Sequence, residues 1–335
     1  MIIKIYRRAV SLFPSAGLTA GALWLMTGTP AGAQLLTPAQ QSYFNSRIGD
    51  RVEAATILGG DYGLGGGAYK TSGNNNSSAN LSVSKFGGMG DIYPIKPLGD
   101  LDIGWQPQLQ GSMGYLTANK NFQNLINGGD TSEQKTFAIQ FGGGARFWFN
   151  DEFSIAPTFM GMYGHSENDY TAVSPFGLAH QAEASREGLI NWSADTWTIR
   201  PSVNVQYQFT WQRTIITLSS EPTYFHTESF SSSGSSSEFT GDSEMWQNKI
   251  DVDYPLGVEL WGHELRTGGY VSRTDLFGGL KDGFNTEDYY DVHGRITLDF
   301  LGELWKVKWL GIGVSHLWGG DFTGWSYGID AAFRF

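Results

Sequence analysis

Hydrophobic and polar residues alternate along several long segments of the chain after about residue 58. Between Leu101 and Tyr115, large apolar side chains fall on odd positions, with polar residues, mostly glutamines, between them. The same alternation runs from Trp197 to Trp211 and from Tyr290 to Phe300. Because successive side chains of a β-strand point to opposite faces, this period of two predicts strands with one apolar and one polar face.

About twelve strands are predicted in residues 58–335. Their ranges are 58–70, 80–93, 101–117, 134–149, 153–165, 195–211, 213–228, 244–254, 258–273, 287–300, 304–318 and 324–335. A change of parity near Trp309 indicates a bulge or a strand start. Short turns are expected at 97–100, 150–152, 212–213, 255–257 and 301–303. Long polar loops are expected at 72–79, 165–188 and 231–242, whereas the last connection, 319–323, is short.

One helix is predicted before the strands, over residues 38–57. Thr37 can cap it, Pro38 suits its first position, and Gln40 completes a T-x-x-Q capping box. Its apolar stripe has spacings of three and four and consists of Phe44, Ile48, Val52 and Ala55. Its charged residues are Arg47, Asp50, Arg51 and Glu53. Gly49 weakens the middle, so this helix is expected to need surroundings that hold it.

Strand length separates two interpretations of the alternation. In a soluble sandwich or barrel the apolar faces pack inward, whereas in a membrane barrel they meet lipid and the polar faces line the interior. The predicted strands, about 11 to 17 residues long, match the roughly 9 to 11 residues needed to cross the hydrocarbon at a tilt. Globular strands are usually about 5 to 6 residues long. We therefore predict an all-β, antiparallel, up-and-down transmembrane barrel of about twelve strands.

The composition agrees with a barrel and argues against several classes of function. Charged residues make up 16% of the chain and aromatic residues 14%, and there are 45 glycines, which together disfavour helical packing. The net charge of −11 argues against nucleic-acid binding. The absence of cysteine excludes disulfides, thiolate metal sites and cysteine nucleophiles. We expect no cofactor and no metal.

Residues 1–33 have the three-part pattern of a secretory signal peptide. Basic residues precede a largely apolar, uncharged stretch, and Ala31-Gly32-Ala33 forms an A-x-A site with cleavage expected before Gln34. The alternative interpretation is an N-terminal membrane anchor. The predicted organisation is thus a signal peptide at 1–33, the helix within 34–57 and the barrel at 58–335.

The last segment, 324–335, alternates to the final residue. Trp325, Tyr327, Ile329, Phe333 and Phe335 share one face, which we expect to meet lipid. Pairing of this strand with the first strand would close the barrel and leave no unpaired edge in hydrocarbon.

This alternating last strand that ends in phenylalanine resembles the assembly signal of Gram-negative outer-membrane β-barrel proteins, with Tyr327, Ile329, Phe333 and Phe335 as its residues. The resemblance implies insertion by the barrel assembly machinery and contact with outer-membrane lipids and lipopolysaccharide. Twelve strands preceded by a helix resemble the translocator unit of autotransporters, and the chain is most similar to the solitary autotransporter-like barrels. The resemblance implies a helix in the lumen and no exported passenger.

Charged residues of both signs occupy the predicted interior face. The positive ones are Arg146, Arg200, Lys249, Arg295 and Arg334, and the negative ones are Asp251, Asp253, Asp291, Asp299 and Asp330. Three interpretations are open. The charges pair with one another in a wet lumen, they bind the charged residues of the helix, or they line a narrow pore.

A catalytic site is the remaining alternative. Ser315 and His316 are adjacent, so their side chains point to opposite faces of a regular strand, which is poor geometry for a lipid hydrolase. We therefore expect no enzyme. The leading hypothesis is a helix-plugged structural or surface-interaction barrel with an unidentified surface ligand. The alternatives are a small-solute channel and a lipid-modifying enzyme such as a phospholipase or deacylase.

Overall fold

The computed structural model describes residues 38–60, 63–72, 78–92, 95–99, 101–122, 128–233, 237–300 and 307–334. Its helices are α2 Pro38–Gly60, α3 Pro175–Arg186 and α4 Gly279–Phe284. Its strands are β1 Gly63–Ser72, β2 Ser78–Asp91, β3 Lys96–Leu98, β4 Leu101–Asn121, β5 Thr131–Trp148, β6 Phe153–Thr171, β7 Ser193–Trp211, β8 Thr214–Ser232, β9 Thr240–Leu260, β10 His263–Gly278, β11 Asp288–Asp299, β12 Val307–Gly319 and β13 Phe322–Arg334. The expected signal peptide at 1–33 lies outside the described residues.

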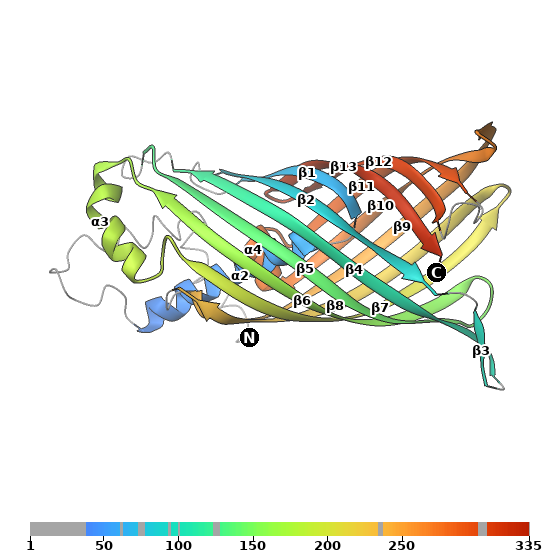
Figure 1. Ribbon diagram of the computed structural model, residues 1–335, viewed down its shortest axis with the longest axis horizontal. Coiled ribbons are helices and arrows are strands. Elements are labelled where there is room, and N and C mark those ends of the chain that lie inside the picture. The colour runs from blue at the N-terminus through green and yellow to red at the C-terminus, as the bar shows by residue number, and fades with distance from the viewer. Residues whose placement is uncertain are drawn as a thin grey trace, which may run out of the picture.

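Twelve strands form a closed antiparallel barrel (Figure 1). Each pairs with its sequence neighbour, and β1 pairs with both β2 and β13, which closes the ring. In that closing register, Leu64 lies opposite Ile329 and Thr71 lies opposite Phe322. The three-residue β3 pairs only with β4, as an extension beyond the ring. The predicted fold class is confirmed, and closure removes the unpaired edge that an open sheet would present to lipid.

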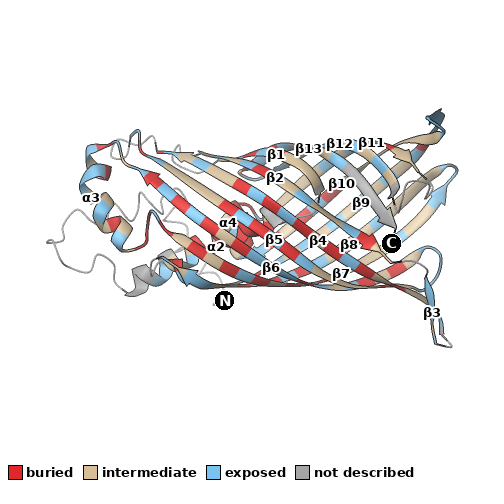
Figure 2. Ribbon diagram, in the orientation of Figure 1, coloured by how far each residue is buried: buried red, intermediate tan, exposed pale blue. Residues whose placement is uncertain are grey.

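The predicted inward and outward faces are confirmed along the long strands. On β4, the inward Gln106 and Gln108 are buried, while the outward Leu109 and Met113 are exposed. On β7, Arg200 is buried and Trp197 is exposed. Figure 2 shows buried and exposed residues alternating along the same strands. A polar interior and an apolar exterior are the reverse of a soluble barrel and suit a surface that meets lipid.

Several predicted boundaries were wrong. The turn expected at 255–257 is a register shift within the β9–β10 pair, where Gly257 has a φ of +70°, and β9 continues to Leu260. The actual turn uses Trp261 and Gly262, both at positive φ. Strand β6 extends well beyond His165, to Thr171, and α2 ends at Gly60 instead of 57. The parity change near Trp309 was correct, because the β12–β13 register shifts between Val307 and Trp309.

The two ends of the barrel differ. At one end, here called the turn end, tight connections join β5 to β6, β7 to β8 and β9 to β10. At the other, the loop end, longer connections include α3, and Figure 1 shows α3 there and the C-terminus toward the turn end. Ser174 caps α3 by accepting a hydrogen bond from the Gly177 N–H, and Pro175 occupies the first turn.

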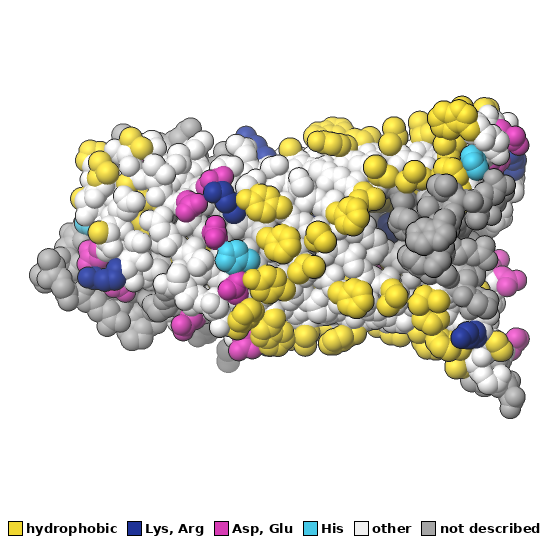
Figure 3. Space-filling model, in the orientation of Figure 1, with side chains coloured by type: hydrophobic (Ala, Val, Ile, Leu, Met, Phe, Trp, Pro, Cys, Tyr) yellow, Lys and Arg dark blue, Asp and Glu magenta, His cyan; other side chains and the backbone are white. Residues whose placement is uncertain are grey.

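On the face shown in Figure 3, an apolar belt covers the barrel and stops at a band of charged side chains toward the loop end. On β5 the outward Phe137, Ile139 and Phe141 belong to the belt. Lys135, two positions nearer the loop end, pairs with Asp169 at 3.3 Å. From Phe137 to Phe147 the strand has about the length that crosses hydrocarbon at a tilt, so residues beyond Lys135 extend past the membrane. Within the described ranges, no helix is long and apolar enough to cross a membrane.

Candidate functional site

Helix α2 lies inside the barrel, in the half toward the loop end, and packs on α4 and on the walls formed by β4, β5, β6 and β9 (Figure 1). Its Ala54, Ala55 and Ile57 belong to one buried apolar cluster with residues of the barrel wall and of α4. We call these partners the collar, which consists of Tyr69, Val83, Leu116, Met162, Phe225, Leu276, Leu280, Phe284 and Phe322. Burial of this apolar surface is the main interaction that holds the helix in place.

Helix α4 folds into the lumen beside α2 and approaches its backbone closely. A Cβ at Gly283 would clash with the Asp50 carbonyl oxygen and lie 2.7 Å from the Cβ of Ala54. On the same side, Arg47 of α2 pairs with Asp282 of α4 at 3.1 Å. The two helices therefore pack as one unit, and α4 was not predicted from the sequence.

Toward its N-terminus, α2 contacts a second apolar cluster. Ile48 and Val52 pack with Trp192, Ala194 and Phe239. A Cβ at Gly49 would lie 2.7 Å from the Phe239 ring. Gly49, predicted to be a weak point of the helix, is the place where α2 lies close against Phe239.

Glu53 is the buried polar contact between the helix and the wall, with 1% of its surface exposed. The Ser243 hydroxyl donates to Glu53 Oε2 at 2.6 Å, and the Thr227 hydroxyl donates to Oε1 at 3.1 Å. The Leu280 N–H of α4 donates to the same Ser243 oxygen at 3.2 Å. Burial raises the pKa of the Glu53 carboxyl to about 7, although both hydroxyl hydrogen bonds act against this shift.

Asp50 lies one helical turn before Glu53. Burial raises the pKa of its carboxyl to about 6, and the nearby charge of Asp282 acts in the same direction. Arg47 and Arg51 lower it, with Arg47 at 3.9 Å. Two carboxyl groups of raised pKa therefore face the interior of the barrel from the same side of α2.

Below α2, toward the turn end, the lumen holds a polar cavity of about 490 Å³. The Arg295 guanidinium donates two hydrogen bonds to Asp251, both at 2.7 Å. Arg146 donates to Ser154 at 3.1 Å and to Gln206 at 2.8 Å. These partners explain how charged side chains are tolerated there, since ionic groups hidden from water need hydrogen-bonded counterparts.

Most of the other predicted wall residues also have polar or aromatic partners, and the side chain of one lies outside the described part of the structure. Arg200 donates to Gln140 at 3.3 Å and lies 3.9 Å from Glu221. Lys249 stands over the Tyr270 ring, and the Tyr270 hydroxyl donates to Asp291 at 2.8 Å. Asp299, at the end of β11, lies opposite Glu264 and Trp309. For Asp330 only the backbone of β13 is described.

Pairing of the wall charges with the helix charges was one of three open interpretations. In the described part of the chain, no ion pair joins Arg47, Asp50, Arg51 or Glu53 to the charged wall residues around the lower cavity. The wall residues pair among themselves, and the helix uses Ser243, Thr227 and Asp282. None of these three was predicted, because a serine or threonine on an inward face has no distinguishing sequence pattern.

The possible catalytic pair is separated. Ser315 faces the lumen and accepts or donates a 2.8 Å hydrogen bond with His293 of the next strand. His316 faces outward, where its Nδ1 lies 2.9 Å from the Gly324 carbonyl oxygen and its ring stacks on Trp325. The two side chains of the predicted pair thus point to opposite faces of β12, as expected for a regular strand.

The last strand carries the residues predicted as an assembly signal. Tyr327 and Ile329 lie on the outward face of β13 and are exposed. Phe333 belongs to β13 by its backbone, and Phe335 lies outside the described residues. The outward aromatic face of β13 agrees with the expected contact with lipid.

Comparison with known proteins decides the family. The model of the solitary outer membrane autotransporter beta-barrel domain matches residues 95–329. The chain belongs to this family. As an autotransporter-type barrel it resides in the outer membrane of Gram-negative bacteria, so the loop end, which carries the longer connections, faces outward.

Solved structures of other autotransporter barrels are similar to this solitary autotransporter barrel. The transport unit of AIDA-I from Escherichia coli is similar with a TM-score of 0.52 at 10% identity, over 87% of this chain and 99% of that one. The translocator domain of NalP from Neisseria meningitidis gives a TM-score of 0.49 at 12% identity, over 88% and 97%. The β-domain of the Bordetella autotransporter BrkA gives 0.49 at 12%, over 79% and 96%. A comparison with curated protein sequences found no match.

Proposed function

We propose that this barrel is a helix-sealed scaffold that does not conduct solutes and presents its loop end to a partner outside the cell. The observation that carries this proposal is the collar. Ala54, Ala55 and Ile57 of α2 pack against wall and α4 side chains that are almost completely buried. A packed apolar layer across a lumen obstructs hydrated ions, because they would lose their water without gaining polar partners.

One part of the loop end, around Asp130, is held by a network of hydrogen bonds, which supports the role of this end as the interacting face. Asp130 receives hydrogen bonds from the Tyr170 and Ser174 hydroxyls and from the Val173 and Ser174 N–H groups, all within 2.8 Å. This network anchors the start of α3. Rigid surface elements bind partners with a smaller loss of conformational entropy than flexible loops.

Conductance in planar bilayers tests the seal. We expect the intact protein to give no stable channel, and a variant lacking residues 38–60 to give a channel. If the deletion variant does not insert, Leu280→Asp can be used instead. It places a charge in the collar and should give a smaller, intermittent conductance. Heat-modifiable migration on gels confirms that each variant forms a barrel. A large steady conductance of the intact protein would exclude the sealed scaffold.

A small-solute channel is the second candidate, favoured by the polar cavity of about 490 Å³ below the helix. That function requires α2 to move, and charged residues such as Arg200 near the cavity would then select ions. Charge reversal at Arg200 and at Asp299 should change the anion-to-cation selectivity of such a channel. Unchanged selectivity would count against this candidate.

The proposed partners follow from the outer face and the last strand. Trp325 and Tyr327, which are 59% and 72% exposed, would contact outer-membrane lipids and lipopolysaccharide. The last strand would be read by the barrel assembly machinery. Deletion of Phe335 should reduce outer-membrane insertion more than secretion across the inner membrane, as measured by membrane fractionation. Equal loss of both would contradict the assembly role.

A further inference from the structure

A second cavity, of about 170 Å³, lies at the loop end between α2 and the barrel wall. We call it the mouth pocket and define it by Ile48, Arg51, Leu58, Leu116, Lys120 and Trp192. Its walls come from α2, from the loop-end parts of β1, β2, β4, β5 and β6, and from α4. The polar cavity lies toward the turn end, and Leu58 and Phe284 line both cavities.

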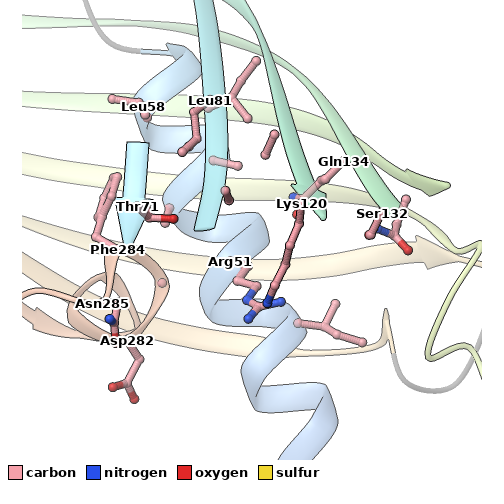
Figure 4. Close-up of a pocket in the computed structure, with 18 of the residues that line it drawn as sticks. Arg51, Leu58, Thr71, Leu81, Lys120, Ser132, Gln134, Asp282, Phe284 and Asn285 are labelled. Atoms are coloured by element: carbon pink, nitrogen blue, oxygen red, sulfur yellow. The ribbon is translucent and has the colours of Figure 1, made fainter. Parts of the chain in front are cut away.

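Two basic side chains, an arginine and a lysine, converge in the mouth pocket. Figure 4 shows Arg51 of α2 and Lys120 of β4 pointing toward one another across it. Within the described ranges, neither cation has a carboxylate oxygen within 4.0 Å. The Lys120 ammonium lies 5.3 Å from the centroid of the Phe122 ring. Asp282 also lines the pocket, but its carboxylate pairs with Arg47 at 3.1 Å.

The arrangement brings two basic groups together without a carboxylate of the described residues in contact with either. Burial, and then the neighbouring Arg47 charge, lowers the pKa of the Arg51 guanidinium, and the nearby Asp50 charge offsets this only in part. Like charges repel more strongly in a confined pocket than in open water, because the surroundings screen them less. An anion between Arg51 and Lys120 would remove the repulsion and supply charge-assisted hydrogen bonds to both.

The rest of the lining indicates what kind of anion fits. Ser132 and Gln134 on β5 add a hydroxyl and an amide to the lining, while Leu58, Leu116 and Trp192 form apolar walls. A cavity of roughly 150 Å³ can hold a benzene molecule, so the mouth pocket has room for a body of about that size. We propose that the mouth pocket binds a compact organic anion, with its carboxylate or phosphate head between Arg51 and Lys120 and its apolar body against Leu58 and Leu116.

Such a ligand would link two parts of the molecule. Arg51 belongs to the helix and Lys120 to the barrel wall, so one anion bridges them. Because binding to the folded state alone stabilises that state, the ligand should raise the unfolding temperature of the barrel with its helix in place. This effect depends on the position of α2 in the lumen and not on whether the barrel conducts.

Titration calorimetry on the intact, detergent-solubilised protein tests the proposal with benzoate, phenyl phosphate, inorganic phosphate and neutral benzyl alcohol. We expect benzoate and phenyl phosphate to bind at least about tenfold more tightly than benzyl alcohol, a difference of about 1.4 kcal/mol. Lys120→Met should weaken both anions by at least about tenfold, and Lys120→Arg should retain them. Benzoate should raise the unfolding temperature of the wild type and not that of Lys120→Met.

Lys135→Met is the matched control, since Lys135 points outward on the neighbouring strand and is paired with Glu133 and Asp169. It should leave benzoate binding unchanged. Equal loss in both lysine variants, equal affinity of Lys120→Met and the wild type, or no binding below about 10 mM would overturn the proposal. If the protein binds inorganic phosphate but does not bind benzoate, the proposal that the ligand is an organic anion is overturned.

Discussion

The hydroxyl of Ser243, on the barrel wall, donates a 2.6 Å hydrogen bond to the carboxylate of Glu53, on the helix inside the barrel. Glu53 is 1% exposed, so this carboxylate is held in an environment that disfavours its charge. The pKa of Glu53 is raised from 4.5 to about 7. The free energy of unfolding therefore depends on whether Glu53 carries a proton.

The first prediction concerns this pH dependence. Below about pH 4.5 Glu53 is protonated in both the folded and the unfolded chain, and its effect on stability is constant. Between pH 4.5 and 7 the unfolded chain loses the proton more readily, so the free energy of unfolding should fall by about 3 kcal/mol and then level off. Asp50, with its pKa raised to about 6, acts in the same direction.

Glu53→Gln removes the titrating group and keeps one carbonyl oxygen, which can accept from either Ser243 or Thr227, while its amide N–H group can donate to the other hydroxyl oxygen. We expect this variant to unfold at a higher temperature than the wild type at pH 8 and to have a weaker pH dependence between pH 5 and 8. Circular dichroism melts in detergent measure both. Glu244→Gln is the control, because Glu244 lies on the outward face of β9, the strand that carries Ser243. A wild-type melting temperature that rises from pH 5 to pH 8 would contradict the prediction.

The barrel could be predicted from the sequence because its signal is local. A strand with lipid on one face and a wet lumen on the other must alternate in polarity, and segments such as Trp197 to Trp211 show this alternation directly. Turn positions were less accurate. Proline and glycine at 255–257 indicate a turn, yet the positive φ of Gly257 is accommodated by a bulge within the β9–β10 pair.

The helix contacts could not be predicted from charge complementarity. Binding of the helix charges by the wall charges was one of three open interpretations. The packing of α2 instead depends on the collar, which assembles side chains from distant strands such as Leu116, Phe225 and Phe322. Helix α4 is only six residues long, and it can pack closely against α2 only because Gly283 has no side chain. Helix α3 was not predicted either, although Ser174-Pro175 at its start is a capping signal in the sequence.

The second prediction concerns the contact between α2 and α4. Gly283→Ala adds a methyl group where the Asp50 carbonyl oxygen and the Ala54 Cβ leave no room. Because both neighbours are tied to the helix backbone, α4 must move away, which should cost about 1–3 kcal/mol of stability. Chemical unfolding in urea measures the loss. Gly161→Ala is the control, since its Cβ would meet nothing within 4 Å, and an equal loss in both variants would contradict this account.

The third prediction concerns the loop end. Burial raises the pKa of Asp130, but hydrogen bonds from Ser174, Tyr170 and Val173 outweigh this effect, so the pKa is lowered overall. The network should therefore be stable at neutral pH and weaken only as the pH falls below about 4. Asp130→Ala should make residues 172–192 sensitive to limited proteolysis at pH 7 while the barrel stays heat-modifiable. Asp151→Ala, in a connection at the turn end, should leave the protease pattern unchanged.

The fourth prediction locates the membrane on the barrel. Phe141 is 69% exposed and lies within the apolar belt, whereas Leu178 is 62% exposed and lies on α3, beyond the charged band. Arginine at the middle of a lipid-facing strand costs about 2–4 kcal/mol, and outside the hydrocarbon this cost is absent. Phe141→Arg should thus reduce folding into lipid vesicles and Leu178→Arg should not, although the two side chains are similarly exposed. If both variants insert equally well, the apolar belt is not the lipid-contacting surface.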